Sequence, residues 1–335
     1  MDAAPAAVAR HPAHTPLIGA LAAAAGLALA LLSLRGLGAG PGAQTFVIIF
    51  TSIVVEALPF VLLGALVSAV LEVYVPRNAF ARVARLPLPL QLPASALAGL
   101  AFPVCECGSV PVARRLIARG VHPAAGLAFM LASPILNPIV LASTAIAYSG
   151  RGVALEMVAG RAGLGLVLAL VAGWAIGGDR AEGLLRARPL EGDHDAAPVA
   201  RSHRASAFFG HLAGDFTFMG RFVVVGAALA AALQTVIPQS IVSGVARTPV
   251  IGSLALMGLA FVLSLCSEAD AFVAVSFVQF PLGAQLAFLV FGPVVDAKLA
   301  FLYGATFRRR FVLRLVAVAV PVVLAGSLWF EVVAR

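Results

Sequence analysis

The chain has 335 residues, of which 61% are hydrophobic and only 11% charged, and its formal net charge is +8. A soluble domain carries about 25% charged residues, so this composition excludes a chain that covers itself with polar side chains in water. The excess of arginine does not predict a nucleic-acid partner, because the arginines lie between apolar segments as in integral membrane proteins. The odd number of cysteines, three, disfavours a closed disulfide framework.

Apolar segments of about 20 residues, long enough to cross a bilayer, recur along the chain and predict an all-α integral membrane protein embedded in lipid. We expect a disordered head at 1–16 and an extra first transmembrane helix at 17–37, retained rather than cleaved as a signal peptide. The later apolar segments are Phe46–Val75, Leu92–Arg119, Pro123–Tyr148, Gly152–Gly177, Ala207–Ile237, Pro249–Phe280, Leu282–Tyr303 and Phe311–Val333. The segments beginning at Leu92 and Pro249 are interrupted by helix-breaking or polar residues.

A polar segment at 178–206 divides the apolar segments into two groups, and its mixed charge predicts a cytoplasmic linker. It separates a first repeat at 45–177 from a second repeat at 207–335. A shift of 159 residues brings four pairs into register: Cys107 with Cys266, Pro134 with Pro293, Asn137 with Asp296, and Glu56 with Asp215. Many transporters are built by internal duplication, with the substrate site at the interface between repeats.

The positions of the cations favour one topology over another. If both interrupted segments are re-entrant hairpins, sixteen loop cations lie on one face of the membrane and four on the other, whereas two full crossings give ten and ten. Because positive loops remain in the cytoplasm, we predict about seven full transmembrane helices plus two re-entrant hairpins, in inverted repeats. Nine full spans are the alternative. The hairpin topology places the N-terminus in the cytoplasm, and we expect a bacterial inner-membrane location.

The first interruption lies between Pro103 and Pro111, which disfavour one continuous helix. Gly108 permits a tight turn there, and Ser109 resembles the start of a new helix. The second interruption covers residues 265–270 and has the spacing of a helix-capping box. The two interruptions would form the tips of the two hairpins: the first tip is residues 105–109 and the second tip is residues 265–270. Both tips resemble helix N-termini, whose free N–H groups favour anions and thiolates.

All three cysteines lie at these two tips, beside glutamates. Buried cysteines are often small apolar fillers, but acids within the membrane are rare and usually functional. Three thiols would suit a soft ligand, and the absence of a C-x-x-C motif disfavours disulfide exchange. The candidate substrate-binding residues at the tips are Cys105, Glu106, Cys107, Gly108, Ser109, Cys266, Ser267, Glu268 and Asp270.

A second pair of breaks is expected at Pro134–Pro138 and around Pro293, where proline interrupts helical hydrogen bonding. Each break is either a simple kink or an unwound lining of the pathway, with Asn137 and Asp296 as polar ligands. The remaining charges inside apolar segments are candidates for proton coupling or for plain charge pairing: Glu56, Asp215, Arg161, Arg221 and Lys298. Arg161 and Arg221 are the candidates to pair with the acids Glu56 and Asp215.

The motifs at 103–111, 132–138 and 265–272 resemble those of the predicted permeases that include organoarsenical efflux permeases, and the resemblance covers about 46–330. It implies a permease and, for some members, export of trivalent methylated or aromatic arsenicals, which bind thiols. Glu106 and Glu268 stand where many relatives have small polar residues, so the substrate of this chain can differ.

We therefore expect a non-enzymatic permease without a cofactor that exports a small solute, with a trivalent organoarsenical or other soft metalloid as the leading substrate. A membrane enzyme of thiol redox chemistry, or a subunit of a permease complex for envelope or pH homeostasis, is the alternative. No G-x-x-x-x-G-K-[ST] motif is present, so active transport would depend on a coupling ion such as the proton, or on a second membrane subunit.

Overall fold

The computed structural model describes residues 41–74, 85–101, 104–178, 181–186, 204–236 and 249–333. The predicted head at 1–16, the predicted helix at 17–37, Pro103 and most of the predicted linker lie outside these ranges. Within them the chain is helical, with one isolated β-bridge between Leu185 and Phe307.

The helices follow the order of the predicted apolar segments. They are α2 (Pro41–Val73), α4 (Leu88–Ala101), α5 (Glu106–Ala118), α6 (Pro123–Leu136), α7 (Pro138–Tyr148), α8 (Ala154–Ile176), α9 (Ala181–Leu184), α10 (Arg204–Val236), α12 (Pro249–Leu263), α13 (Asp270–Ala274), α14 (Leu282–Phe291), α15 (Ala297–Thr306) and α16 (Arg309–Val333). A short 3₁₀ turn, Ser149–Arg151, follows α7.

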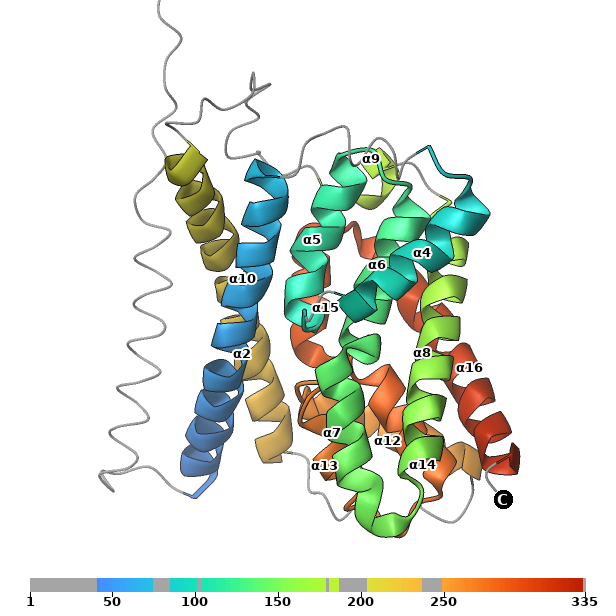
Figure 1. Ribbon diagram of the computed structural model, residues 1–335. Coiled ribbons are helices and arrows are strands. Elements are labelled where there is room, and N and C mark those ends of the chain that lie inside the picture. Colours follow the sequence, from blue (N-terminus) through green and yellow to red (C-terminus); the bar gives the residue numbers. More distant parts are fainter. Residues whose placement is uncertain are drawn as a thin grey trace, which may run out of the picture.

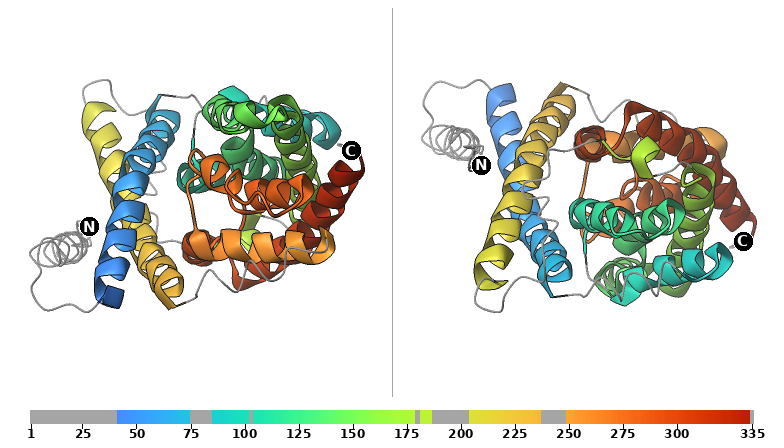
Figure 2. Two further views of the ribbon diagram at one scale, coloured as in Figure 1. Left: turned by 90° about the horizontal axis from the view of Figure 1, so that it is seen from below. Right: turned by 90° about the horizontal axis from the view of Figure 1, so that it is seen from above.

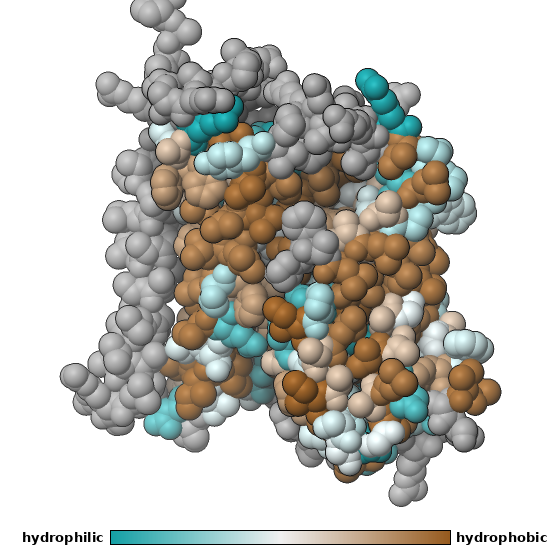
Figure 3. All heavy atoms as spheres, viewed as in Figure 1, coloured by the Kyte–Doolittle hydropathy of each residue, from teal (hydrophilic) through white to brown (hydrophobic). Residues whose placement is uncertain are grey.

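Five described stretches are long and apolar enough to cross a membrane: Gly42–Val73, Pro123–Arg151, Ala154–Ile176, Arg204–Thr235 and Arg310–Val333. The face shown in Figure 3 is largely covered by hydrophobic side chains, and large apolar residues such as Trp174 and Trp329 are exposed. Such a surface is costly in water and suits lipid, so the chain is a multi-pass membrane protein.

The helices form a crossed pair and a bundle beside it (Figure 2). The crossed pair consists of α2 and α10, which pack extensively against each other. It contacts the bundle through α5 and α15. Figure 1 shows α4 and α5 in the upper half of the bundle, whereas α12, α13 and α14 lie in the lower half. Several short helices therefore end inside the bundle, where their terminal peptide groups need polar partners.

Two of the predicted transmembrane segments are broken into shorter helices. The segment Pro123–Tyr148 divides at Asn137, whose side-chain oxygen accepts a 3.0 Å hydrogen bond from the Ile139 N–H and caps α7. The segment Leu282–Tyr303 divides into α14 and α15 around Pro293, where a break is expected, and Asp296 caps α15 by accepting from the Leu299 N–H at 2.6 Å. The two caps thus occupy positions that the 159-residue shift brings into register.

The prolines near these breaks have different positions. Pro134 lies inside α6, two residues before its end, and Pro138 is the first residue of α7, where its missing N–H costs nothing. Pro293 lies in the turn between α14 and α15. Both breaks therefore lie where the prolines predict them, and each ends at a capping residue, Asn137 or Asp296.

The first tip differs in detail from the prediction. Helix α5 begins at Glu106 rather than at Ser109, and it continues through Pro111. The Ser109 hydroxyl donates to the Glu106 carbonyl at 3.0 Å and so does not cap the helix. Gly108 is helical rather than part of a turn, and its missing side chain serves close packing instead.

That packing joins α5 to α2 through two glycines. A Cβ atom on Gly64 would lie 2.3 Å from the Cα of Gly108, a backbone atom that cannot rotate away. We expect Gly64→Ala to lower the free energy of unfolding by about 1–3 kcal/mol, the usual cost of overpacking. Thermal unfolding in detergent measures the change. Gly220→Ala on α10 is the matched control, since a Cβ atom on Gly220 would have no neighbour within 4 Å among the described residues, and an equal loss in both variants would contradict the prediction.

Candidate functional site

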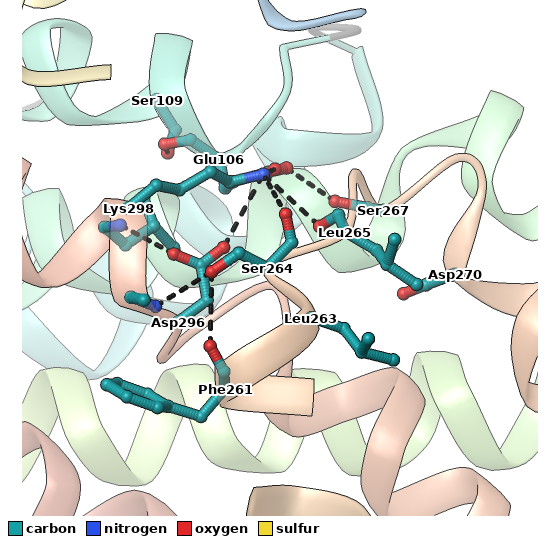
Figure 4. Close-up of polar contacts among 12 residues, drawn as sticks. Glu106, Ser109, Phe261, Leu263, Ser264, Leu265, Ser267, Asp270, Asp296 and Lys298 are labelled. Atoms are coloured by element: carbon teal, nitrogen blue, oxygen red, sulfur yellow. Dashed lines mark hydrogen bonds and ion pairs between the residues drawn. The ribbon is translucent and has the colours of Figure 1, made fainter. Parts of the chain in front are cut away.

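Three chain breaks meet inside the bundle, and the residues beside them form a buried polar network (Figure 4). Glu106 is the first residue of α5, and Ser264–Ala269 connects α12 to α13. Asp296 and Lys298 lie at the start of α15. Short helices end here because prolines, glycine and polar residues interrupt the apolar sequence, and the side chains of the breaks supply partners for one another.

The central contact of the network is an ion pair between Glu106 and Lys298. Lys298 Nζ lies 2.8 Å from Glu106 Oε1, and both side chains are almost fully buried. The second carboxylate oxygen of Glu106 accepts a 2.7 Å hydrogen bond from the Ser267 hydroxyl. Glu106 thus contacts both the second tip and α15, which joins the two parts of the chain.

Lys298 has further partners that hold its ammonium group in place. Its Nζ donates to the carbonyls of Ser264 at 3.2 Å and Leu265 at 3.3 Å, and it lies 3.6 Å from Asp296 Oδ2. Ser264 has φ = 47°, a left-handed conformation uncommon for a residue with a side chain. Its hydroxyl accepts from the Ala297 N–H at 3.0 Å, which fixes the second tip to the start of α15.

A second buried ion pair joins Arg161 of α8 to Asp270 at the start of α13. The guanidinium donates to both carboxylate oxygens, at 2.8 and 2.7 Å, in a bidentate arrangement. It also donates to the Thr144 hydroxyl at 2.9 Å and to the Ser267 carbonyl at 3.2 Å. The predicted pairing of Arg161 with Glu56 or Asp215 is therefore wrong, because Asp270 occupies the guanidinium.

The capping box predicted at the second tip is also absent. Ala269 is the N-cap of α13 and makes no side-chain cap, while Ser267 directs its hydroxyl to Glu106. A capping hydroxyl would accept from a helix N–H, whereas the Ser267 hydroxyl donates a charge-assisted hydrogen bond to the Glu106 carboxylate.

Asp215 belongs to a separate cluster where α2, α5 and α10 meet. Its carboxylate forms a short ion pair with Arg115 and accepts from the Ser68 hydroxyl at 2.8 Å. Arg115 also binds Glu72 at 2.9 Å, and Arg119 binds the other oxygen of Glu72 at 2.9 Å. The sequence reasoning missed this cluster, although Arg115 and Arg119 are four residues apart and so share one face of a helix.

Arg221 and Glu56 do not join either buried ion pair. Arg221 is exposed on α10 and lies 4.6 and 4.9 Å from the ring centroids of Phe218 and Phe222, a cation–π arrangement. Glu56 is half-buried on α2 and lies within the electrostatic reach of Lys298 and Glu106. The pairing predicted between Arg221 and Asp215 is thus replaced by the contact of Asp215 with Arg115.

The three cysteines are buried and free. Cys105 precedes α5 as its N-cap, Cys107 follows Glu106, and Cys266 lies on the second tip. In the part of the chain that the structure describes, no group of three or more His, Cys, Asp or Glu side chains is arranged to hold a metal ion. The predicted three-thiol site is therefore not assembled as a metal centre in this conformation.

Comparison with known proteins places the chain among membrane permeases. A family model described as "predicted permease" matches residues 43–332. The chain is 41% identical over 281 residues to the UPF0718 protein YcgR of Bacillus subtilis, covering 84% of this chain and 95% of that protein. It is 32% identical over 280 residues to a Streptococcus mutans protein named "Putative two-component membrane permease complex subunit", covering 80% and 89% respectively. No solved structure matches.

Proposed function

Because this chain belongs to the predicted permease family, we propose that it is a non-enzymatic carrier that exports a small solute through the buried network at the tips. The observation that carries the proposal is the pair of buried ion pairs, Glu106–Lys298 and Arg161–Asp270. Charged groups inside a membrane are expensive and usually mark a transport pathway. Both pairs lie where helices are broken, as in transporters that bind substrate near the membrane midplane.

We further propose that the chain consists of inverted repeats with two re-entrant hairpins. Two features support this. The helices α4 and α5 occupy one half of the bundle, and α12 and α13 occupy the other (Figure 1). The caps at Asn137 and Asp296 lie at positions related by the 159-residue shift, each at the second half of a broken helix. Inverted repeats would bring both hairpin tips to the centre of the membrane.

The arginines support an orientation for this topology. Arg114 of α5 donates to the carbonyls of Arg186 and Thr306. Arg186 follows α9 and Thr306 ends α15, so these contacts hold α5, α9 and α15 together at one end of the bundle. Arg308, Arg309 and Arg310 follow directly after α15 or begin α16. We place this arginine-rich end, and with it the N-terminus, in the cytoplasm of a bacterial cell.

The leading substrate is a trivalent organoarsenical or another soft metalloid. Thiols are the protein ligands such solutes prefer, and the three thiols of the chain lie at the two tips. Since the thiols form no metal centre in this conformation, recognition would require the tips to move as the solute binds.

Uptake of methylarsenite into everted membrane vesicles tests the substrate. Everted vesicles present the cytoplasmic face outward, so export appears as uptake. We expect wild-type vesicles to accumulate the arsenical and the variants Cys105→Ser, Cys107→Ser and Cys266→Ser to fall to background, because a hydroxyl is a poor soft ligand. Ser149→Ala, at an exposed position after α7, should transport like wild type. A well-expressed wild type without arsenical uptake would remove this substrate and leave the permease assignment in place.

A role as one subunit of a permease complex is the second candidate. It is favoured by the name of the Streptococcus mutans relative, which describes that protein as a complex subunit. Mild cross-linking followed by purification in mild detergent tests whether the chain has a partner subunit. The expected result is that a second membrane protein purifies with this chain in a constant molar ratio. A chain that purifies alone and transports after reconstitution would contradict it.

A further inference from the structure

Glu268 differs from the other acids of the buried network. Both of its carboxylate oxygens are buried, and among the described residues no cation contacts them; the Cys266 thiol, a weak donor, lies within reach. The residue lies on the second tip, between Ser267 and the start of α13. A buried acid that no cation contacts needs an explanation, because burying an ionised carboxylate without a charged partner is very costly.

The neighbouring acids have the partners that Glu268 lacks. Glu106 contacts Lys298 and Ser267, and Asp270 contacts Arg161 through both oxygens. Asp296 accepts from a backbone N–H and lies 3.6 Å from the Lys298 ammonium. Each of these acids therefore has a cation close to its carboxylate, which Glu268 does not have.

The cations of the buried network, Lys298 and Arg161, are already paired with acids other than Glu268. The charged and titratable groups near Glu268 include Glu106, Lys298, Asp270 and the Cys266 thiol. Lys298 already contacts the carboxylates of Glu106 and Asp296. The guanidinium of Arg161 is already held by its bidentate ion pair with Asp270. Glu106 carries the same sign of charge that an ionised Glu268 would carry, so the field of the network opposes ionisation. In this conformation the neutral acid is the form that fits the site.

We propose that Glu268 is the site that binds the coupling proton, an inference that rests on the proposed export function. The carboxylate takes one proton from water when the tip opens toward the outside, and the neutral acid fits the closed site. The acid releases that proton when the tip opens toward the cytoplasm, so one O–H bond forms and breaks per cycle. Proton entry then drives solute export without any nucleotide.

An infrared measurement tests the protonation state without a substrate. The carbonyl stretch of a neutral carboxylic acid is distinct from carboxylate bands. We expect wild-type protein in lipid vesicles at neutral pH to show a neutral-acid band that Glu268→Gln removes. Glu156→Gln, at an exposed position near the start of α8, should leave the band unchanged. An identical neutral-acid band in wild type and Glu268→Gln would overturn the proposal.

A transport measurement tests the coupling itself. Reconstituted vesicles are assayed for methylarsenite flux with and without an imposed pH gradient, and the ratio of the two fluxes is compared among variants. We expect the gradient to raise the flux in wild type and in Glu156→Gln, and the ratio to fall to one in Glu268→Gln. A ratio that stays at the wild-type value in Glu268→Gln would overturn the proposal. Absence of any wild-type flux would count against the substrate, and the infrared result would still decide the proton site.

Discussion

Replacing Lys298 with methionine is expected to lower the free energy of unfolding by about 3–5 kcal/mol and to abolish transport. The variant removes the cation that lies 2.8 Å from Glu106 and 3.6 Å from Asp296. Glu106 would then be a buried carboxylate without a cation, although it would keep the hydrogen bond from the Ser267 hydroxyl. Unfolding in detergent, followed by intrinsic fluorescence, measures the loss.

The double variant Lys298→Met with Glu106→Gln separates lost charge pairing from lost packing. Removing both charges leaves no uncompensated ion, so most of the stability should return while transport remains absent. Glu106→Gln alone should cost less than Lys298→Met, because Lys298 keeps Asp296 and the carbonyls of Ser264 and Leu265. A double variant as unstable as Lys298→Met would show that the loss comes from packing and contradict the role assigned to the ion pair.

Replacing Arg161 with glutamine is expected to have an effect of similar size, about 3–5 kcal/mol, because it leaves Asp270 buried without a cation. Arg161→Lys should lie between wild type and Arg161→Gln. Lysine keeps the charge, but one ammonium group cannot reproduce the flat bidentate contact together with the bonds to Thr144 and the Ser267 carbonyl. The measurement is the free energy of unfolding of wild type, Arg161→Lys and Arg161→Gln, which should decrease in that order.

Arg221→Gln is the matched control for this series, since it makes the same substitution at another arginine within an apolar helix. Arg221 is exposed and contacts aromatic rings, so its loss should cost at most about 1 kcal/mol. Equal losses at Arg161 and Arg221 would indicate a general effect of removing arginine and would contradict the importance of the Asp270 pair.

The sequence predicts where the helices break, because the signals are local. Proline and polar residues cluster near residues 103–111, 137, 265–270 and 296, and the helices are interrupted in each of these regions, although Pro111 and Pro134 themselves lie inside helices. The exact helix start is less predictable. A serine near a proline resembles a cap, but Ser109 donates to the Glu106 carbonyl instead, and α5 begins three residues earlier.

The sequence does not predict the ion partners, because these depend on distant segments. Arg161 and Asp270 are 109 residues apart, and Asp215 and Arg115 are 100 residues apart. A choice among several buried cations and acids requires knowledge of how the helices pack. Ser267 shows the same limit, since its spacing matches a local cap while its hydroxyl reaches a carboxylate 161 residues away.

Both buried ion pairs join a residue before position 178 to a residue after position 204. In a dry interior, separating opposite charges costs far more than in water, where each ion regains a hydration shell. The two parts of the chain can therefore separate at the tips only as water enters between them. We therefore expect closed tips to exclude water and, with it, ions, which would keep the membrane sealed while the protein rests.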